Sequence, residues 1–251
     1  MLEGRNLRVS YGGFVALDGV SVRLEQGRVT GLIGPNGAGK STLFSVLAGA
    51  VRPAGGAVLF RGEDITALPP AARARLGLGR SFQLARAFAG LTVLESMLVA
   101  APVRRHESVW AALFARRALR REQEENVARA RALLQRVDLW RLADAPAAAL
   151  SGGQKKLLDL CRALMLEPDF ILLDEPSAGV NPTRIGEITG FIRALRDEGV
   201  SFGMVEHNMG MIRALCDHVY ALAEGRVVAE GDFETVAASD EVARAYLGAQ
   251  P

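Results

Sequence analysis

The sequence predicts an α/β fold with a mixed, largely parallel β-sheet, an N-terminal antiparallel β layer and an inserted helical subdomain. Three observations predict it. The runs at 170–173 and 200–205 are apolar without alternation, as in strands covered on both faces of a parallel sheet. Segments with period-2 alternation precede them, between residues 7 and 24. Residues 85–149 are rich in Ala, Leu and Arg and lack strand signals.

Composition narrows the class of protein. The chain has 251 residues, 49% of them hydrophobic, which is enough for a sizeable core. The formal net charge is +2, so we expect no nucleic-acid partner. There is no signal-peptide pattern and no apolar run of membrane-spanning length. Cys161 and Cys216 lack metal-ligand spacing, and we expect buried, reduced thiols.

The antiparallel layer is predicted from three N-terminal segments. Residues 7–11 and 20–24 alternate with period 2, and residues 55–62 form another strand flanked by turns. Tyr11 ends the first segment and is followed by two glycines. It could stack on a nucleotide base, or it could be an ordinary surface tyrosine on a strand, and its position favours neither.

A glycine-rich motif follows the predicted strand 29–33 and precedes an apolar run at helical spacing, 43–47. It matches G-x-x-x-x-G-K-[ST] and therefore predicts a P-loop NTPase core. The alternative is a glycine-rich turn with an incidental Lys-Ser, which the strand and helix on either side argue against. The motif comprises Gly34, Pro35, Asn36, Gly37, Ala38, Gly39, Lys40, Ser41 and Thr42.

The residue types in this motif suit ATP and Mg²⁺. Glycines let the backbone curl around a phosphate, and the N-terminus of the following helix favours an anion. Lys40 can reach the β- and γ-phosphates, and the Ser41 hydroxyl can ligate Mg²⁺.

Residues 69–80 predict a short helix, after which the helical insertion begins. Its basic pairs, such as Arg116-Arg117 and Arg120-Arg121, favour a solvated helix face, although a surface that meets lipid or a membrane subunit is the alternative. The insertion ends at Asp144-Ala145-Pro146. It is followed by Ser151, Gly152, Gly153 and Gln154, which open a predicted helix at 155–166. Ser151 is a good N-cap, and the segment could form a second anion site. A single phosphate loop does not need a second anion site in the same chain. The presence of a second one suggests that it helps to form a site together with another molecule.

Acidic residues and a histidine end two predicted core strands. Asp174 and Glu175 follow the run 170–173, and His207 follows the run 200–205. Open α/β sheets bind ligands at the carboxyl ends of their strands. Asp174 suits the Mg²⁺ shell, Glu175 suits a base that orients or deprotonates water, and His207 suits a sensor of phosphate. A helix at 185–197, a hairpin over 219–229 and helical C-terminal residues complete the chain.

Together these motifs resemble those of the ATP-binding-cassette (ABC) ATPases, in which Leu-Ser-Gly-Gly-Gln, here residues 150–154, is the family signature. The resemblance implies a single domain over 1–251, with a core at 1–84 and 155–251 and a helical, signature-bearing subdomain at 85–154. It implies that Tyr11 packs on adenine, that Gln83 contacts Mg²⁺ or the attacking water, and that His207 contacts the γ-phosphate. It also implies a head-to-tail pair of ATPase subunits, with each signature meeting ATP on the other subunit.

A closer resemblance is to the ATPase subunits of branched-chain amino-acid importers. It lies in Arg80-Ser81-Phe82-Gln83, in 91–95, in the Arg-rich segment before the signature, in 178–182 and in 205–209. It implies transmembrane permease partners and a peripheral location on the cytoplasmic face of the inner or plasma membrane. Asn181 departs from the Asp of many members, so an acidic role is in question there.

Other functions share parts of this pattern. An ABC ATPase of another transport system, such as lipid or lipopolysaccharide export, would share these motifs. A soluble ABC ATPase of DNA repair or translation usually has two cassettes, zinc insertions or long coiled coils. A small GTPase needs N-K-x-D, and no Asn here precedes Lys. A nucleotide-dependent scaffold would not need Glu175.

Overall fold

The computed structural model describes residues 1–80, 90–102 and 116–247. The chain divides into two compact units. The first comprises residues 1–81, 168–178 and 182–251, and the second comprises residues 82–167 with 179–181. Among the described residues, no helix has both the length and the apolar character needed to span a membrane.

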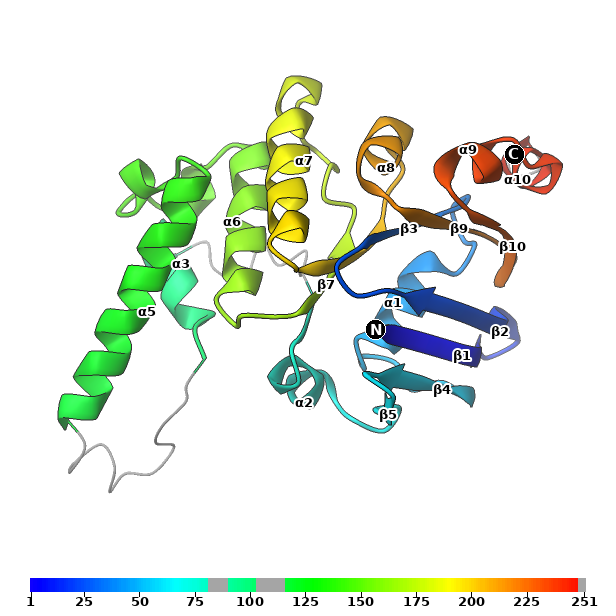
Figure 1. The fold of residues 1–251 in the computed structure, drawn as a ribbon, viewed down its shortest axis with the longest axis horizontal. Coiled ribbons are helices and arrows are strands. Elements are labelled where there is room, and N and C mark those ends of the chain that lie inside the picture. The colour runs from blue at the N-terminus through cyan, green and yellow to red at the C-terminus, as the bar shows by residue number, and fades with distance from the viewer. Residues whose placement is uncertain (81–89, 103–115, 248–251) are drawn as a thin grey trace. The chain divides into compact units, whose positions relative to one another are not determined.

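The first unit contains two sheets (Figure 1). The smaller is antiparallel, in the order β2-β1-β4-β5. Its strands are β1 (Leu2–Tyr11), β2 (Phe14–Leu24), β4 (Gly55–Phe60) and β5 (Glu63–Asp64).

The larger sheet has the order β10-β9-β3-β8-β7-β6 and is parallel except for the β9–β10 hairpin. Its strands are β3 (Val29–Ile33), β6 (Leu78–Arg80), β7 (Phe170–Asp174), β8 (Ser201–Val205), β9 (His218–Ala223) and β10 (Arg226–Gly231). The expected mixed sheet and antiparallel layer are confirmed.

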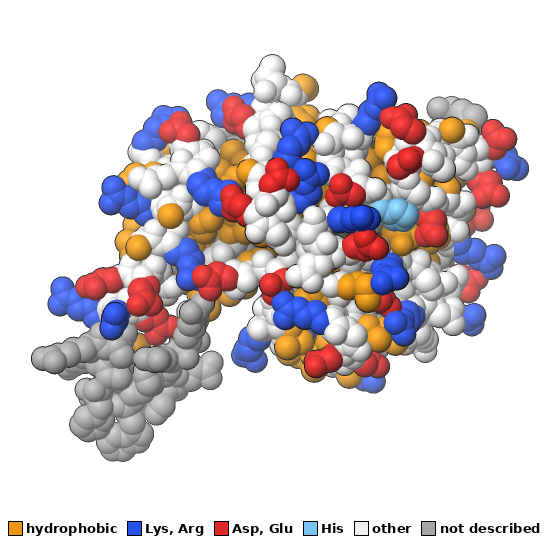
Figure 2. Space-filling view, in the orientation of Figure 1, with side chains coloured by type: hydrophobic (Ala, Val, Ile, Leu, Met, Phe, Trp, Pro, Cys, Tyr) orange, Lys and Arg blue, Asp and Glu red, His pale blue; other side chains and the backbone are white. Residues whose placement is uncertain are grey.

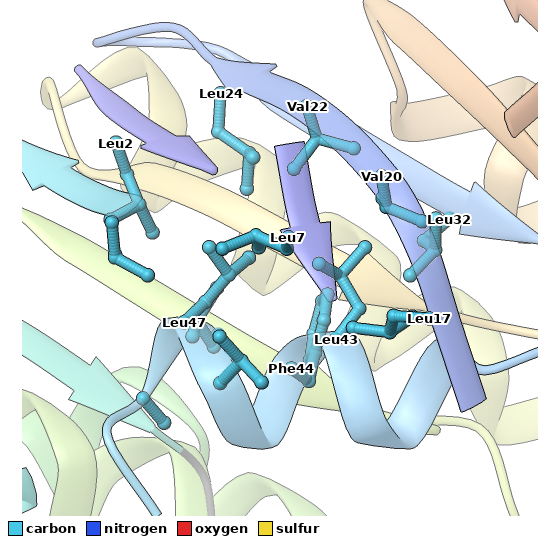
Figure 3. Close-up of a cluster of buried hydrophobic side chains, with 14 of the residues drawn as sticks. Leu2, Leu7, Leu17, Val20, Val22, Leu24, Leu32, Leu43, Phe44 and Leu47 are labelled. Atoms are coloured by element: carbon cyan, nitrogen blue, oxygen red, sulfur yellow. The ribbon is translucent and has the colours of Figure 1, made fainter. Parts of the chain in front are cut away.

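Helix α1 (Lys40–Leu47) lies against the antiparallel sheet and β7. Leu43, Phe44 and Leu47 point from this helix toward the apolar face of β1 and β2 (Figure 3). Burying each such side chain contributes about 1.5–3 kcal/mol. This packing anchors the helix whose N-terminus carries the glycine-rich motif.

The other helices of the first unit are α2 (Pro70–Arg75), α7 (Pro182–Asp197), α8 (Met209–Leu215), α9 (Phe233–Ala237) and α10 (Asp240–Leu247). The helix expected over 69–80 is only partly right, because Leu78–Arg80 form strand β6. Gly77 ends the helical segment with φ +95°. Strand β6 then pairs with β7, with Leu78 opposite Phe170. Three residues with a central glycine have too little pattern to predict such a strand.

The described part of the second unit is helical, as expected. It contains α3 (Val93–Val99), α5 (Arg116–Arg136), α6 (Gly152–Leu164) and two short 3-10 turns at Trp140–Leu142 and Ala147–Ala149. Arg120 and Arg121 on α5 are exposed and pair with Glu124 and Glu125 one turn later. These pairs are typical of the solvated helix face favoured by the sequence.

Acidic and basic side chains are interspersed on the surface shown in Figure 2. In the first unit, Arg226 pairs with Asp18 at 2.6 Å, and Arg61 pairs with Asp169. Both cysteines are free thiols: Cys161 is buried and Cys216 is partly buried. Burial raises the pKa of each thiol to about 12, so both are protonated at neutral pH.

Candidate functional site

The glycine-rich motif joins strand β3 to helix α1, as its sequence context predicts. Gly34 has φ +145°, and a Cβ there would lie 2.1 Å from the carbonyl oxygen of Leu222. Gly39 has φ +100°, and a Cβ there would lie 2.5 Å from the carbonyl oxygen of Ala16. Only glycine satisfies both the backbone conformation and the close approach at these two positions.

The N-terminus of helix α1 is suited to binding an anion. Its N-cap is Gly39, which has no side chain to accept a hydrogen bond from the first-turn N–H groups. Those N–H groups have no acceptor within the helix and can meet phosphate oxygens. Ser41 is exposed on this first turn, Thr42 is half-buried, and Asn36 and Gly37 are exposed in the loop before it.

Lys40 is buried and lies folded back over the loop. Its Nζ donates to the carbonyl oxygens of Gly34 at 2.7 Å and Pro35 at 2.8 Å. The Pro35 carbonyl also accepts from the Ala38 N–H at 3.3 Å. Burial lowers the pKa of the Lys40 ammonium, while the carboxylates of Glu175 and Asp174 act in the opposite direction. The ammonium is therefore in the electrostatic field of the acidic pair that ends β7.

The register of the parallel sheet gathers the acidic pair and the histidine at one edge. Asp174, the last residue of β7, is opposite Val205, the last residue of β8. Strand β3 lies on the other side of β8 and runs parallel to it into Gly34. The carboxyl ends of β3, β8 and β7 thus bring the glycine-rich loop, His207 and the acidic pair to the same side of the sheet.

Glu175 and His207 are in contact. Glu175 Oε1 lies 3.3 Å from His207 Nε2, and both side chains are partly exposed. Glu175 adopts φ +48°, an uncommon conformation for a residue with a side chain. Its N–H donates to the carbonyl oxygen of Val205 at 2.9 Å. The contact leaves a carboxylate accessible to water beside an imidazole that can orient it.

Asp174 is paired with Arg80, a residue that the sequence analysis did not assign to the site. The Arg80 Nη2 lies 3.2 Å from Asp174 Oδ2, and both side chains are largely buried. The same guanidinium lies 3.4 Å from the Ser45 hydroxyl. Arg80 ends strand β6, which neighbours β7 in the sheet, and the sequence has no pattern that predicts this strand. Gln83, expected near Mg²⁺, lies outside the described residues.

Tyr11 lies at the tip of the β1–β2 hairpin and is 51% exposed. Phe14 is directly opposite it and is also exposed. The tyrosine ring is therefore accessible to a nucleotide base. The role in binding adenine that the resemblance implies for Tyr11 stays a prediction.

The second unit carries the segment that opens helix α6. Ser151 is its N-cap: Ser151 Oγ accepts from the Gln154 N–H at 3.4 Å, and Gln154 Oε1 accepts from the Ser151 N–H at 3.0 Å. A serine hydroxyl that accepts here retains its own O–H as a donor. A Cβ at Gly152 would lie 2.6 Å from the carbonyl oxygen of Gly179, and Gly153 is buried. The geometry suits an anion site at a helix N-terminus.

The profile of the ABC transporter family matches residues 17–178. The chain belongs to this family. The matched region of this ABC protein contains the glycine-rich loop, the segment that opens α6 and the acidic pair at the end of β7.

Curated relatives match this ABC protein over nearly its whole length. A probable branched-chain amino acid transport ATP-binding protein, LivG of Archaeoglobus fulgidus, is 39% identical, covering 100% of this chain and 96% of the relative. The high-affinity branched-chain amino acid transport ATP-binding protein BraF of Pseudomonas aeruginosa is 36% identical, covering 99% of this chain and 98% of the relative.

Solved structures share the fold of this ABC protein. The crystal structure of the ADP conformation of an ATP-binding cassette of an ABC transporter has a TM-score of 0.87 at 36% identity. That match covers 99% of this chain and 98% of the other. A dimeric bacterial ABC transporter cassette has a TM-score of 0.77 at 25% identity, covering 93% of this chain and 99% of the other.

Proposed function

We propose that this chain is the ATP-hydrolysing subunit of an ABC transporter that imports branched-chain amino acids or related small polar solutes. The family of the chain and the names of its full-length relatives support the transport role. The observation that most supports ATP hydrolysis is the contact between Glu175 and His207, which lies at the same edge of the sheet as the glycine-rich loop.

In the proposed mechanism, ATP phosphates bind at the N-terminus of α1. Lys40 Nζ exchanges the carbonyl oxygens of Gly34 and Pro35 for β- and γ-phosphate oxygens. Because both carbonyls already hold the ammonium close to the loop, little side-chain reorganisation is needed. Tyr11, accessible at the hairpin tip, would stack on the adenine.

The residues at this sheet edge fit Mg²⁺, which prefers oxygen ligands and shares its shell with substrate phosphates. The Ser41 hydroxyl and the Asp174 carboxylate would hold it, with Gln83 as a further expected ligand. When bound, Mg²⁺ neutralises charge on the phosphate oxygens. Arg80, now paired with Asp174 Oδ2, would share that carboxylate with the cation or release it.

Hydrolysis in this mechanism depends on Glu175 and His207. Glu175 accepts a proton from the attacking water, or orients the water for attack on the γ-phosphate. His207 contacts the γ-phosphate and orients the carboxylate from 3.3 Å. General-base catalysis of this kind contributes roughly 10²- to 10⁴-fold to a rate.

A second ATPase subunit completes the site. The segment Ser151 to Gln154 of each subunit would meet the γ-phosphate held by the loop of the other, which gives its serine hydroxyl and helix N-terminus an anion to bind. The dimeric bacterial cassette with the same fold supports a pair of subunits. ATP then shifts the population toward the closed dimer because that state binds ATP better. Closure would drive permease subunits, and the protein would act as a peripheral subunit on the cytoplasmic face of the membrane.

The Glu175→Gln variant tests the proposed chemistry. We expect kcat for ATP hydrolysis to fall by about 10²–10⁴-fold, with affinity for a fluorescent ATP analogue unchanged within about twofold. With ATP, this variant should elute as a dimer of the 26.8 kDa chain in size-exclusion chromatography. Glu187→Gln, on the exposed face of α7, is the matched control and should behave as wild type. Normal turnover by Glu175→Gln would refute the assignment of the base.

Reconstitution tests the transport role. The tagged chain, expressed with its genomic neighbours, should co-purify with transmembrane permease subunits. Proteoliposomes containing that complex and its solute-binding protein should accumulate leucine, isoleucine or valine when ATP is present. The Glu175→Gln complex should not. ATP-dependent transport of another solute, or purification without any membrane subunit, would contradict branched-chain import.

A further inference from the structure

Glu206 is a buried carboxylate that the proposed mechanism does not use. It follows β8 directly, and only 2% of the residue is exposed. An isolated charge in such a position is costly, so the groups around it must compensate. The arrangement of those groups points to a role beyond packing.

Three backbone N–H groups donate to the Glu206 carboxylate. Oε1 accepts from Ser177 N–H at 2.6 Å, and Oε2 accepts from His207 N–H at 2.7 Å and Asn208 N–H at 2.9 Å. Hydrogen bonds to a charged acceptor are shorter and about twice as strong as neutral ones. Only an ionised carboxylate offers two acceptor oxygens without a donor of its own.

These donors belong to two different loops. Ser177 lies in the loop that follows β7 and Glu175, whereas His207 and Asn208 form the turn between β8 and α8. Asn208 is itself fixed, because its side chain accepts from Met211 N–H at 3.0 Å and caps α8. One carboxylate thus ties the loop of the proposed base to the start of a helix.

Two hydrogen bonds between these loops lie on either side of the Glu175 backbone and directly before His207. Glu175 N–H donates to Val205 at the end of β8, and two residues later Ser177 N–H donates to Glu206. Between these hydrogen bonds, Glu175 is held at φ +48° with its carboxylate 3.3 Å from His207.

We infer that Glu206 is a positioning residue that sets the distance between the Glu175 carboxylate and the His207 imidazole. This inference rests on the proposed hydrolysis of ATP. Its effect is mechanical: the carboxylate fixes the backbone after Glu175, at Ser177, and the backbone of His207 itself.

The Glu206→Gln variant tests the inference, because its amide is isosteric but turns an NH₂ group toward an N–H donor. In nucleotide-free protein, we expect the amides of 175–178 and 207–209 to exchange at least about tenfold faster with deuterium. Affinity for a fluorescent ATP analogue should stay within about twofold, while kcat falls by about 10- to 100-fold. Glu3→Gln is the matched control: Glu3 is also a buried carboxylate of the first unit, but it pairs with Arg5. It should leave exchange at both loops and kcat unchanged.

A double-mutant cycle separates positioning from general destabilisation. His207→Ala should lower kcat strongly in the wild-type background but by less than about twofold in Glu206→Gln, because the imidazole is already displaced. If Glu206→Gln does not fold, Glu206→Asp replaces it; the shorter side chain should release Ser177 N–H while His207 N–H stays protected. Additive losses, or unchanged exchange at both loops, would overturn the inference. Absence of turnover in the wild type would instead refute the proposed function, and the exchange measurement would still test whether Glu206 fixes the two loops.

Discussion

Replacing Arg73 by Met should destabilise the first unit strongly, although Arg73 is not one of the proposed site residues. Its side chain is fully buried on helix α2. The guanidinium donates to the carbonyl oxygens of Val46 at 2.8 Å and Leu47 at 2.6 Å, at the C-terminus of α1. It also donates to Leu68 at 3.0 Å and Thr66 at 3.1 Å. The last carbonyls of a helix lack partners within it, and a cation there also suits the helix dipole.

The expected magnitude follows from these four hydrogen bonds. Burial lowers the pKa of Arg73, opposed by the nearby Asp64 carboxylate, so burying this charge has a cost that its partners offset. Arg73→Met keeps the apolar stem but removes the guanidinium donors from these carbonyls, although the Val46 carbonyl still accepts from Gly49 N–H at 3.0 Å. Leaving one buried acceptor without its donor costs about 1–3 kcal/mol, so loss of the donors to several of these carbonyls should cost about 3–5 kcal/mol in total. For a chain of 251 residues, this corresponds to a fall in Tm of about 6–10 °C.

Differential scanning calorimetry and urea unfolding measure the effect. Arg75→Met is the matched control, because Arg75 lies on the same helix but is exposed, and it should change stability by less than about 0.5 kcal/mol. Arg73→Lys should be intermediate, since a single ammonium cannot reproduce the planar fork of donors. Equal stability of Arg73→Met and Arg75→Met would refute the argument that Arg73 holds the C-terminus of α1.

Two glycine substitutions make the same chemical change with opposite expected results. Gly39→Ala forces a Cβ to 2.5 Å from the Ala16 carbonyl oxygen at φ +100°, so it should lower Tm and weaken ATP binding at least about tenfold, measured with a fluorescent analogue. Gly186→Ala, exposed within α7 with no atom within 4 Å of the new Cβ, should raise stability by about 0.5–1 kcal/mol and leave ATP binding unchanged. Unaltered ATP affinity in Gly39→Ala would contradict the argument that position 39 admits only glycine. A lower Tm in Gly186→Ala would contradict the argument that position 186 has room for a side chain.

Local sequence pattern was sufficient to predict those parts of the site whose residues are consecutive in the chain. The glycine-rich loop between a strand and a helix, the serine that caps α6 and the acidic end of β7 were all predicted from neighbouring residues. Uninterrupted apolar runs likewise indicated the parallel strands β7 and β8, because strands covered on both faces need no alternation.

Tertiary structure decided the contacts between residues distant in sequence. Strand β6 exists because it pairs with β7, about 90 residues later in the chain. The Arg80–Asp174 pair and the carbonyls that bind Arg73 depend on how α1, α2 and β6 pack, and no local pattern encodes that. Glu206 was visible as a charge at a strand end, but its three donors come from two loops that only the β7–β8 register brings together. Local residues therefore specify which groups can do the chemistry, and long-range packing determines the distances at which they meet.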